Sequence, residues 1–181
     1  MIHYDLAWVK TKYDSGETLK FIFFWGHTQK GKALGQFVFS QWYPSLFVVD
    51  GVSYKTAEHW IMAQKAKLFD DDACFEKIVR SDKPGEVKEL GRQIRNFDTQ
   101  QWDASKFDIV KRGNLYKFQQ DAKLKDYLLT TQDRIIVEAS PVDSIWGIGL
   151  SQDAKGAENP HQWKGENLLG FAIMEVRDLL K

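Results

Sequence analysis

The sequence predicts an α+β fold: a single helix-rich domain with a small, mainly antiparallel sheet. Short runs of β-branched and aromatic residues gather in the first third of the chain, and apolar residues at helical spacing dominate the rest. No linker, repeat or low-complexity tract interrupts the 181 residues. Strands early and helices later are typical of α+β domains, so we expect residues 1–181 to form one domain.

The expected strands are short. Residues 19–25 and 36–39 have strand-like patterns, and residues 46–49 and 52–55 predict a hairpin. Its turn is Asp50-Gly51, a pair that tolerates the positive φ values of a tight turn. The compact β-branched run at 135–139 predicts a buried strand.

Capping and helix-breaking residues predict where the helices begin and end. Thr56 is placed to cap a helix over residues 57–69, and Pro84 and Gly91 frame a short helix. Three aspartates at 70–72 favour the start of a helix over residues 74–79. Three more helices are expected over residues 105–122, 124–129 and 167–180. Between them, residues 140–165 are rich in Gly, Pro and Trp and predict a long binding loop or lid.

Composition excludes several classes of protein. Basic and acidic side chains balance at 25 each, which disfavours non-specific binding to a nucleic-acid backbone. The apolar runs are far too short to span a membrane. One cysteine, Cys74, cannot form an internal disulfide, and no signal-peptide pattern opens the chain. We expect a cytoplasmic monomer.

The strong generic signatures of catalysis are missing. The chain has no phosphate-binding glycine loop, no HExxH and no CxxC. Its four histidines are scattered, so we expect neither a metal site nor a cofactor. Cys74 lies in an amphipathic pattern and is interpreted as an apolar filler, not as a nucleophile.

Glu58 and Lys65 are the most informative polar pair. Seven residues apart on one helix, they share a face, about 10 Å apart along the axis. That distance exceeds an ordinary intrahelical salt bridge, and the lysine side chain leans toward the helix N-terminus. Either a substrate lies between the two side chains, or both are solvated surface charges. Glu58 falls in the first turn, where the helix dipole favours the ionised carboxylate.

The seven tryptophans exceed what core packing requires. Trp102 and Trp146 neighbour polar or glycine residues near the ends of expected elements. They either line a pocket for another flat ring or close the edge of the core.

Several segments resemble the YbiA-like NADAR family in identity and order. The likeness runs from about residue 23 to residue 180. The matching segments are FSQWYP at 39–44, TAEHW at 56–60 through Lys65, Trp102-Asp103, Lys117-Phe118, VEASPVDSIWGIG at 137–149, and GENLLG at 165–170 with Arg177. Gln41 departs from the asparagine that is common in the family at its position.

The resemblance implies an N-glycosidase fold that acts on ribose attached through nitrogen. Family members hydrolyse phosphoribosylamino-pyrimidine intermediates of riboflavin biosynthesis and release ribose 5-phosphate and an aminopyrimidine. Others resemble enzymes that remove ADP-ribose from guanine. By this likeness six residues fall on active-site positions: Glu58, Lys65, Trp102, Asp103, Asp143 and Trp146.

The residue types suit this chemistry. Cleavage of a glycosidic C–N bond builds positive charge on the sugar and negative charge on the leaving nitrogen. Glu58 is the candidate for stabilising the sugar cation, and Asp143 or Asp103 for orienting water or assisting protonation. Lys65 either forms a Schiff base with the sugar carbon or only binds a hydroxyl or phosphate.

The candidate substrate-binding residues complete the hypothesis. Arg92 and Arg112 offer guanidinium groups for a phosphate. Gly147 and Gly149 allow a close approach, and Asn167 either binds substrate or caps a helix. The full candidate binding set is Ser40, Arg92, Trp102, Arg112, Trp146, Gly147, Gly149 and Asn167. The alternative from another class is a non-catalytic module that binds NAD-derived nucleotides.

Overall fold

The structure is a computed structural model that describes residues 3–29 and 31–181. Contacts group these residues into two compact units. One runs up to Ser40 and resumes at Lys123–Lys181, and the other is Gln41–Ala122. Because the first unit uses both ends of the chain, no single cut in the sequence separates the two.

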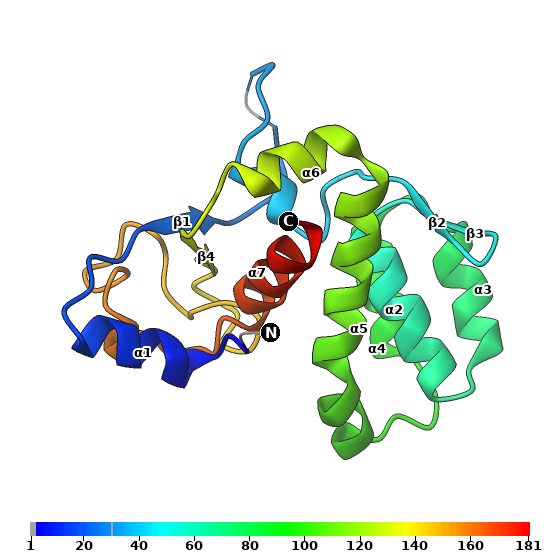
Figure 1. Cartoon of the computed structure of the whole chain (residues 1–181). Helices are drawn as coiled ribbons and strands as arrows, with labels where there is room; N and C mark the ends of the chain where they lie inside the picture. The colour runs from blue at the N-terminus through cyan, green and yellow to red at the C-terminus, as the bar shows by residue number, and fades with distance from the viewer. Residues whose placement is uncertain (1–2, 30) are drawn as a thin grey trace. The chain divides into compact units, whose positions relative to one another are not determined.

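The unit Gln41–Ala122 begins with the predicted hairpin (Figure 1). Strands β2 (Phe47–Val49) and β3 (Val52–Tyr54) pair antiparallel, with Phe47 opposite Tyr54. Asp50 and Gly51 have φ values of 50° and 78°, as expected for the tight turn. The Asp50-Gly51 prediction is therefore confirmed.

Four helices complete this unit, and α2 is its centre. α2 (Ala57–Leu68) contacts α3 (Asp72–Arg80), α4 (Pro84–Arg92) and α5 (Thr99–Gln120). The Trp60 indole on α2 donates a hydrogen bond to the Ile109 carbonyl at 2.9 Å. Gly113 makes room for this ring, since a Cβ there would lie 2.3 Å from Trp60 Cδ1. Large residues on α2 thus pack against the small position on α5.

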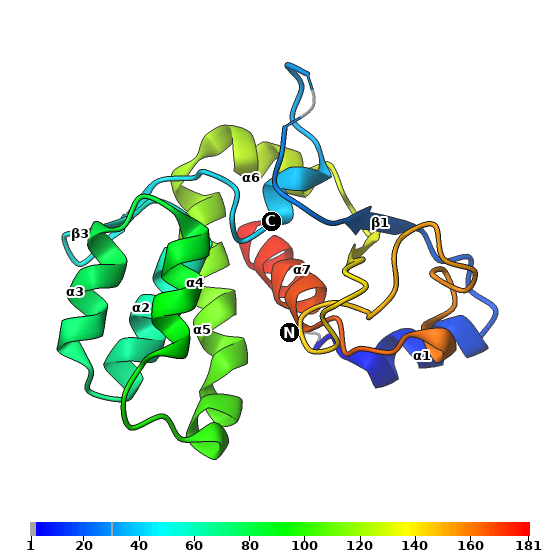
Figure 2. The ribbon, with the colours of Figure 1, turned by 180° about the vertical axis from the view of Figure 1, so that it is seen from behind.

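The other unit is built on a pair of parallel strands. β1 (Phe21–Phe24) pairs with β4 (Ile135–Glu138), from Phe21 opposite Ile135 to Phe24 opposite Glu138. Helix α7 (Leu168–Leu180) contacts β4, and Figure 2 shows it from behind. Gly170 permits this contact, because a Cβ there would lie 2.1 Å from the Ile136 carbonyl oxygen. The buried side chains of β4 and α7 form the core of this unit.

Shorter elements surround this pair. They are α1 (Leu6–Asp14), the 3₁₀ turns η1 (Gln36–Phe39) and η2 (Pro160–Gln162), and α6 (Ala122–Leu129), which begins at the boundary between the units. Residues 140–165 are otherwise irregular, as predicted. No helix in the described ranges combines the length and apolar character needed to cross a membrane.

The α+β class is confirmed, but three local predictions were wrong. Residues 36–39 form a 3₁₀ turn instead of a strand. The Val38 and Ser40 N–H groups donate to the carbonyls of Gly35 and Phe37, three residues back, so these backbone groups are paired within the turn and not with a neighbouring strand. In place of one mainly antiparallel sheet, the described strands form two two-stranded sheets, one parallel and one antiparallel. Helix α5 begins at Thr99, not at residue 105, because the Asp98 side chain accepts the Gln101 N–H.

Candidate functional site

Glu58 occupies the first turn of α2. The Thr56 hydroxyl caps the helix by accepting the His59 N–H, as predicted. The Glu58 residue is only 8% exposed, and its own N–H donates to the Gln41 carbonyl at 2.9 Å. The positive end of the helix dipole favours an ionised carboxylate there. A buried anion at this position suits the stabilisation of a developing sugar cation.

His59, beside Glu58, is a structural residue. Its ring nitrogens pair with the Thr56 hydroxyl at 2.8 Å and the Ser81 carbonyl at 3.1 Å. Burial lowers the pKa of the imidazole, so it is neutral at pH 7. His59 therefore ties the start of α2 to the residue after α3.

The Lys65 amine, along the same helical face of α2 as Glu58, donates to a backbone carbonyl. Nζ donates to the Gly91 oxygen at 2.8 Å, in the last turn of α4. It also lies 4.3 Å from the centre of the Phe97 ring and 5.5 Å from that of Trp102. Burial lowers the pKa of the ammonium group. The structure thus brings Lys65 and Trp102 together at the end of α4.

Trp102 and Asp103 have different surroundings although they are adjacent. The Trp102 ring is half-buried against Lys65. The Asp103 carboxylate is exposed and pairs with Lys106 at 2.7 Å. An exposed, paired carboxylate is a weaker candidate for proton chemistry than a buried one.

The two candidate arginines also differ. Arg92 is exposed and pairs with Glu89 one turn earlier on α4. The Arg112 guanidinium lies 5.5 Å from the centre of the Trp60 ring and lines a pocket of 430 Å³ with Gln64 and Lys67. Asp108 lines the same pocket and pairs with Lys111 at 3.0 Å. Of the two arginines, Arg112 has the better surroundings for a phosphate, since Lys67 is a second cation in this lining and the Asp108 carboxylate is paired.

Asp143 organises the loop that carries Trp146. Its Oδ1 accepts the N–H groups of Ile145 at 2.9 Å and Trp146 at 2.8 Å. Its carbonyl accepts the Gly149 N–H at 3.1 Å. The side chain thus performs the turn-forming role typical of aspartate, and the Trp146 ring is left half-buried. Asp143 and Trp146 are brought together in this unit.

The two loop glycines meet different requirements. At Gly147 the close neighbour is the protein itself, because a Cβ would lie 2.8 Å from the Glu138 carbonyl oxygen. Gly149 has φ of 65°, in the left-handed region that glycine favours. The Ile148 N–H between them donates to that same Glu138 carbonyl at 2.9 Å. These contacts bind the loop to the end of β4.

Asn167 and Ser40 are the remaining candidate binding residues in this unit. Asn167 is fully buried and makes no side-chain cap. Its Oδ1 accepts the Glu138 N–H at 2.9 Å and its Nδ2 donates to the Ile136 carbonyl at 3.0 Å. The amide therefore extends the hydrogen bonding of β4. Ser40 is half-buried at the end of η1.

Lys117 lies in a segment that matches the family but was not among the candidate site residues, and its surroundings make it a functional candidate. It lies on α5, is 1% exposed, and burial lowers the pKa of its ammonium group to about 7. One turn earlier, the Asn114 amide exchanges two hydrogen bonds with Gln41, at 3.1 and 2.9 Å. Lys117 has the helical spacing of the core residues Val110 and Asn114, and that register was the available signal.

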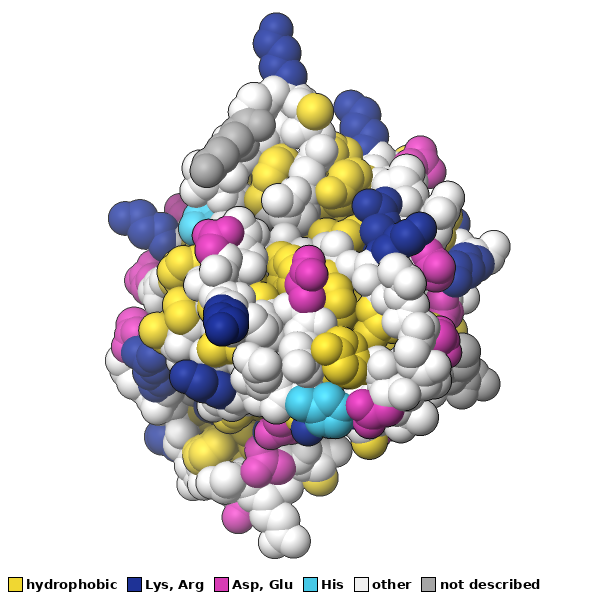
Figure 3. Space-filling view, turned by 90° about the vertical axis from the view of Figure 1, so that its left-hand side faces the viewer, with side chains coloured by type: hydrophobic (Ala, Val, Ile, Leu, Met, Phe, Trp, Pro, Cys, Tyr) yellow, Lys and Arg dark blue, Asp and Glu magenta, His cyan; other side chains and the backbone are white. Residues whose placement is uncertain are grey.

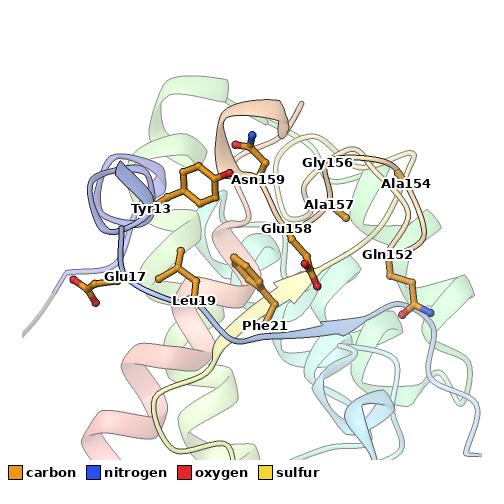
Figure 4. A pocket seen from close by; sticks show the side chains of 10 residues that line it. All are labelled: Tyr13, Glu17, Leu19, Phe21, Gln152, Ala154, Gly156, Ala157, Glu158 and Asn159. Carbon is orange, nitrogen blue, oxygen red and sulfur yellow. The ribbon is translucent and has the colours of Figure 1, made fainter. Parts of the chain in front are cut away.

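A further pocket of 460 Å³ lies in the unit that contains α1 (Figure 4). Tyr13, Leu19 and Phe21 form one side, and residues 152–159 form the other. Glu17 and Glu158 supply the charge of this lining, and none of the candidate residues lies there. Two carboxylates disfavour a phosphate-bearing substrate.

Comparisons with known proteins identify the family to which this chain is similar. The NADAR domain model matches residues 23–181. N-glycosidase R617 of Acanthamoeba polyphaga mimivirus is 44% identical, over 90% of this chain and 97% of its own. N-glycosidase YbiA of Escherichia coli is 32% identical over 73% of this chain and 74% of its own. The solution structure of E. coli YbiA superposes with a TM-score of 0.68 at 27% identity, covering 89% of this chain and 84% of that one. The chain therefore belongs to the NADAR family.

Proposed function

We propose that this NADAR protein is an N-glycosidase that hydrolyses the ribosyl C–N bond of phosphoribosylamino-pyrimidines. The coarser assignment, a hydrolase of N-glycosyl bonds, rests on the relatives named N-glycosidases. The observation that carries the proposal is the Glu58 carboxylate, buried in the first turn of a helix that Thr56 already caps. A carboxylate in this place supports the charge that the reaction creates.

The proposed reaction adds one water across the C–N bond. As the bond breaks, its electron pair leaves with the nitrogen, and positive charge spreads over the anomeric carbon and the ring oxygen. The Glu58 carboxylate stabilises this charge. Water supplies a hydroxyl to the anomeric carbon and a proton to the amine. The products are ribose 5-phosphate and an aminopyrimidine.

The mechanism has two testable forms, one with a covalent lysine–sugar intermediate and one without. In one, a lysine amine attacks the anomeric carbon of the ring-opened imine, displaces the aminopyrimidine, and is released by water as ribose 5-phosphate forms. Burial lowers the pKa of both Lys65 and Lys117, which raises the fraction of neutral amine. In the other form Lys65 remains on the Gly91 carbonyl and holds Trp102 in place.

The test of the function compares Glu58→Gln with the wild type. Glu76→Gln is the matched control, because Glu76 is an exposed glutamate on α3 paired only with Arg80 in the described structure. Release of ribose 5-phosphate should fall by about 100-fold or more in Glu58→Gln and stay unchanged in Glu76→Gln. Unfolding midpoints show whether both variants fold.

The outcomes separate the candidate functions. Turnover of ADP-ribosylated guanine without turnover of the pyrimidine would move the substrate to that class. No turnover of either substrate, with ADP-ribose still bound, would favour a non-catalytic module. Borohydride added during turnover, followed by peptide mass analysis, identifies which lysine carries sugar, and no adduct on either would exclude the covalent form.

A further inference from the structure

We propose that the pocket at the carboxyl ends of β1 and β4 binds the leaving heterocyclic base through Trp25, Gln152 and Asp153. This inference rests on the proposed N-glycosidase function and assigns its base-binding subsite. The pocket has a volume of 440 Å³, within the range of small-molecule sites. It lies wholly in the unit that contains the parallel strands.

The pocket lies between two segments of the candidate site. Its lining includes Phe24 and Ala139, and the Ala139 N–H donates to the Phe24 carbonyl at 2.9 Å where the two strands end. The lining also includes Ser151–Asp153, which begins two residues after Gly149 in the chain. It includes Phe37 as well, whose carbonyl accepts the Ser40 N–H at 3.2 Å. The pocket is therefore lined by segments that continue directly from the Asp143–Gly149 loop and from Ser40.

The apolar part of the lining is aromatic. Phe23 and Phe37 are half-buried, and Trp25 is 63% exposed. The side view in Figure 3 shows several patches of apolar side chains on the surface. An exposed indole beside two phenyl rings offers a face on which a flat heterocycle stacks. Stacking on aromatic side chains typically contributes about 1–3 kcal/mol per base.

The polar part of the lining matches the edge of an amino-substituted base. The Asp153 carboxylate and the Gln152 amide form no side-chain hydrogen bond within the described ranges. In Figure 4 the Gln152 amide extends toward the carboxyl end of β1. A carboxylate accepts bonds from adjacent ring N–H and amino groups, and a carboxamide donates to a ring carbonyl. Aminopyrimidinones and guanine present both kinds of group.

Charge decides which end of the substrate enters. Among the described residues that line the pocket, none is lysine or arginine, and Asp153 supplies the formal charge. A negative, aromatic pocket repels a phosphate and accepts a neutral base. The base therefore enters this pocket, and the phosphate binds elsewhere.

Calorimetric binding of free base to the full-length protein tests this subsite without requiring turnover. The probes are a triaminopyrimidinone, guanine, uracil and ribose 5-phosphate. Trp25→Ala should weaken binding of the first two by about 5- to 100-fold, and Trp25→Phe should restore most of it. Asp153→Asn should narrow the preference for the amino-substituted base over uracil. Leu46→Ala, which removes a side chain that is 66% exposed in the other unit, is the control for folding and should change nothing.

Three results would overturn the subsite. In the first, the wild-type protein binds no free base. In the second, Trp25→Ala binds the base as tightly as the wild type. In the third, Trp25→Ala loses affinity for the base and for ribose 5-phosphate to the same extent. The proposed function fails separately, when the wild type releases no ribose 5-phosphate although the free base binds.

Discussion

Replacing Asn167 by alanine should destabilise the protein by several kilocalories per mole. The mutation removes the partners of two buried backbone groups on β4, the Glu138 N–H and the Ile136 carbonyl. Each buried group left without a hydrogen bond costs about 1–3 kcal/mol. Alanine also pays about 1 kcal/mol for the left-handed φ of 56°. We expect the free energy of unfolding to fall by about 3–7 kcal/mol.

Two further variants separate these contributions. Asn167→Gly loses the same hydrogen bonds without the backbone strain, so it should be about 1 kcal/mol more stable than Asn167→Ala. Asn96 is the matched control, since it has φ of 57° but is exposed and makes no side-chain hydrogen bond in the described structure. Asn96→Ala should lose only about 1 kcal/mol. Urea unfolding followed by tryptophan fluorescence measures all three variants.

The result that would refute this reasoning is a shift in substrate binding without a shift in stability. If Asn167→Ala unfolded within about 1 kcal/mol of the wild type while KM rose tenfold, the amide would be contacting substrate. The hydrogen bonds to β4 would then contribute little. If the alanine variant does not fold, Asn167→Gly provides the same comparison.

Three other predictions concern Lys117, Asp143 and His59. Because burial lowers the pKa of Lys117 to about 7, the folded state binds fewer protons than the unfolded state between pH 7 and 10. The free energy of unfolding should therefore rise over this pH range, and Lys117→Met should flatten the rise in urea titrations at several pH values. Asp143→Ala should lower both the activity and the protection of the Trp146 amide from hydrogen exchange. Asp143→Asn keeps an oxygen acceptor and should retain that protection. Equal exchange rates in the two variants would contradict the turn-forming role of Asp143. His59, neutral when folded, should make stability fall as pH drops below about 6.5, and His59→Gln should reduce the fall in acid unfolding curves.

Local signals in the sequence predicted those elements whose causes are local. Asp50-Gly51 specified the hairpin turn, and Thr56 specified the start of α2. Helix α1 was missed because only Val9 of its nine residues is buried, which leaves no apolar period to detect. The pairing of β1 with β4 joins residues far apart in the chain, and a strand pattern does not name its partner.

The candidate site was predictable in residue type more than in residue role. Glu58 was identified by its spacing and by the resemblance, and its helix forms as predicted. Lys117 lies in a matching segment but was not assigned to the site, and its burial depends on packing that composition does not reveal. Asn167 shows the same limit, since an asparagine can cap, turn or bind with one amide, and only the position of β4 decides among these roles.

Residues 143–149, one of the segments that resemble the family, mainly stabilise the local fold. Asp143 holds two backbone N–H groups, Gly147 fits against the Glu138 carbonyl, and Gly149 adopts a left-handed turn. A chain could keep all three features and bind a nucleotide without cleaving it. Thr56 already caps α2, so the carboxylate of Glu58 is not required for that cap. Retention of the fold with loss of turnover in Glu58→Gln is therefore the property that distinguishes an enzyme from a binding module.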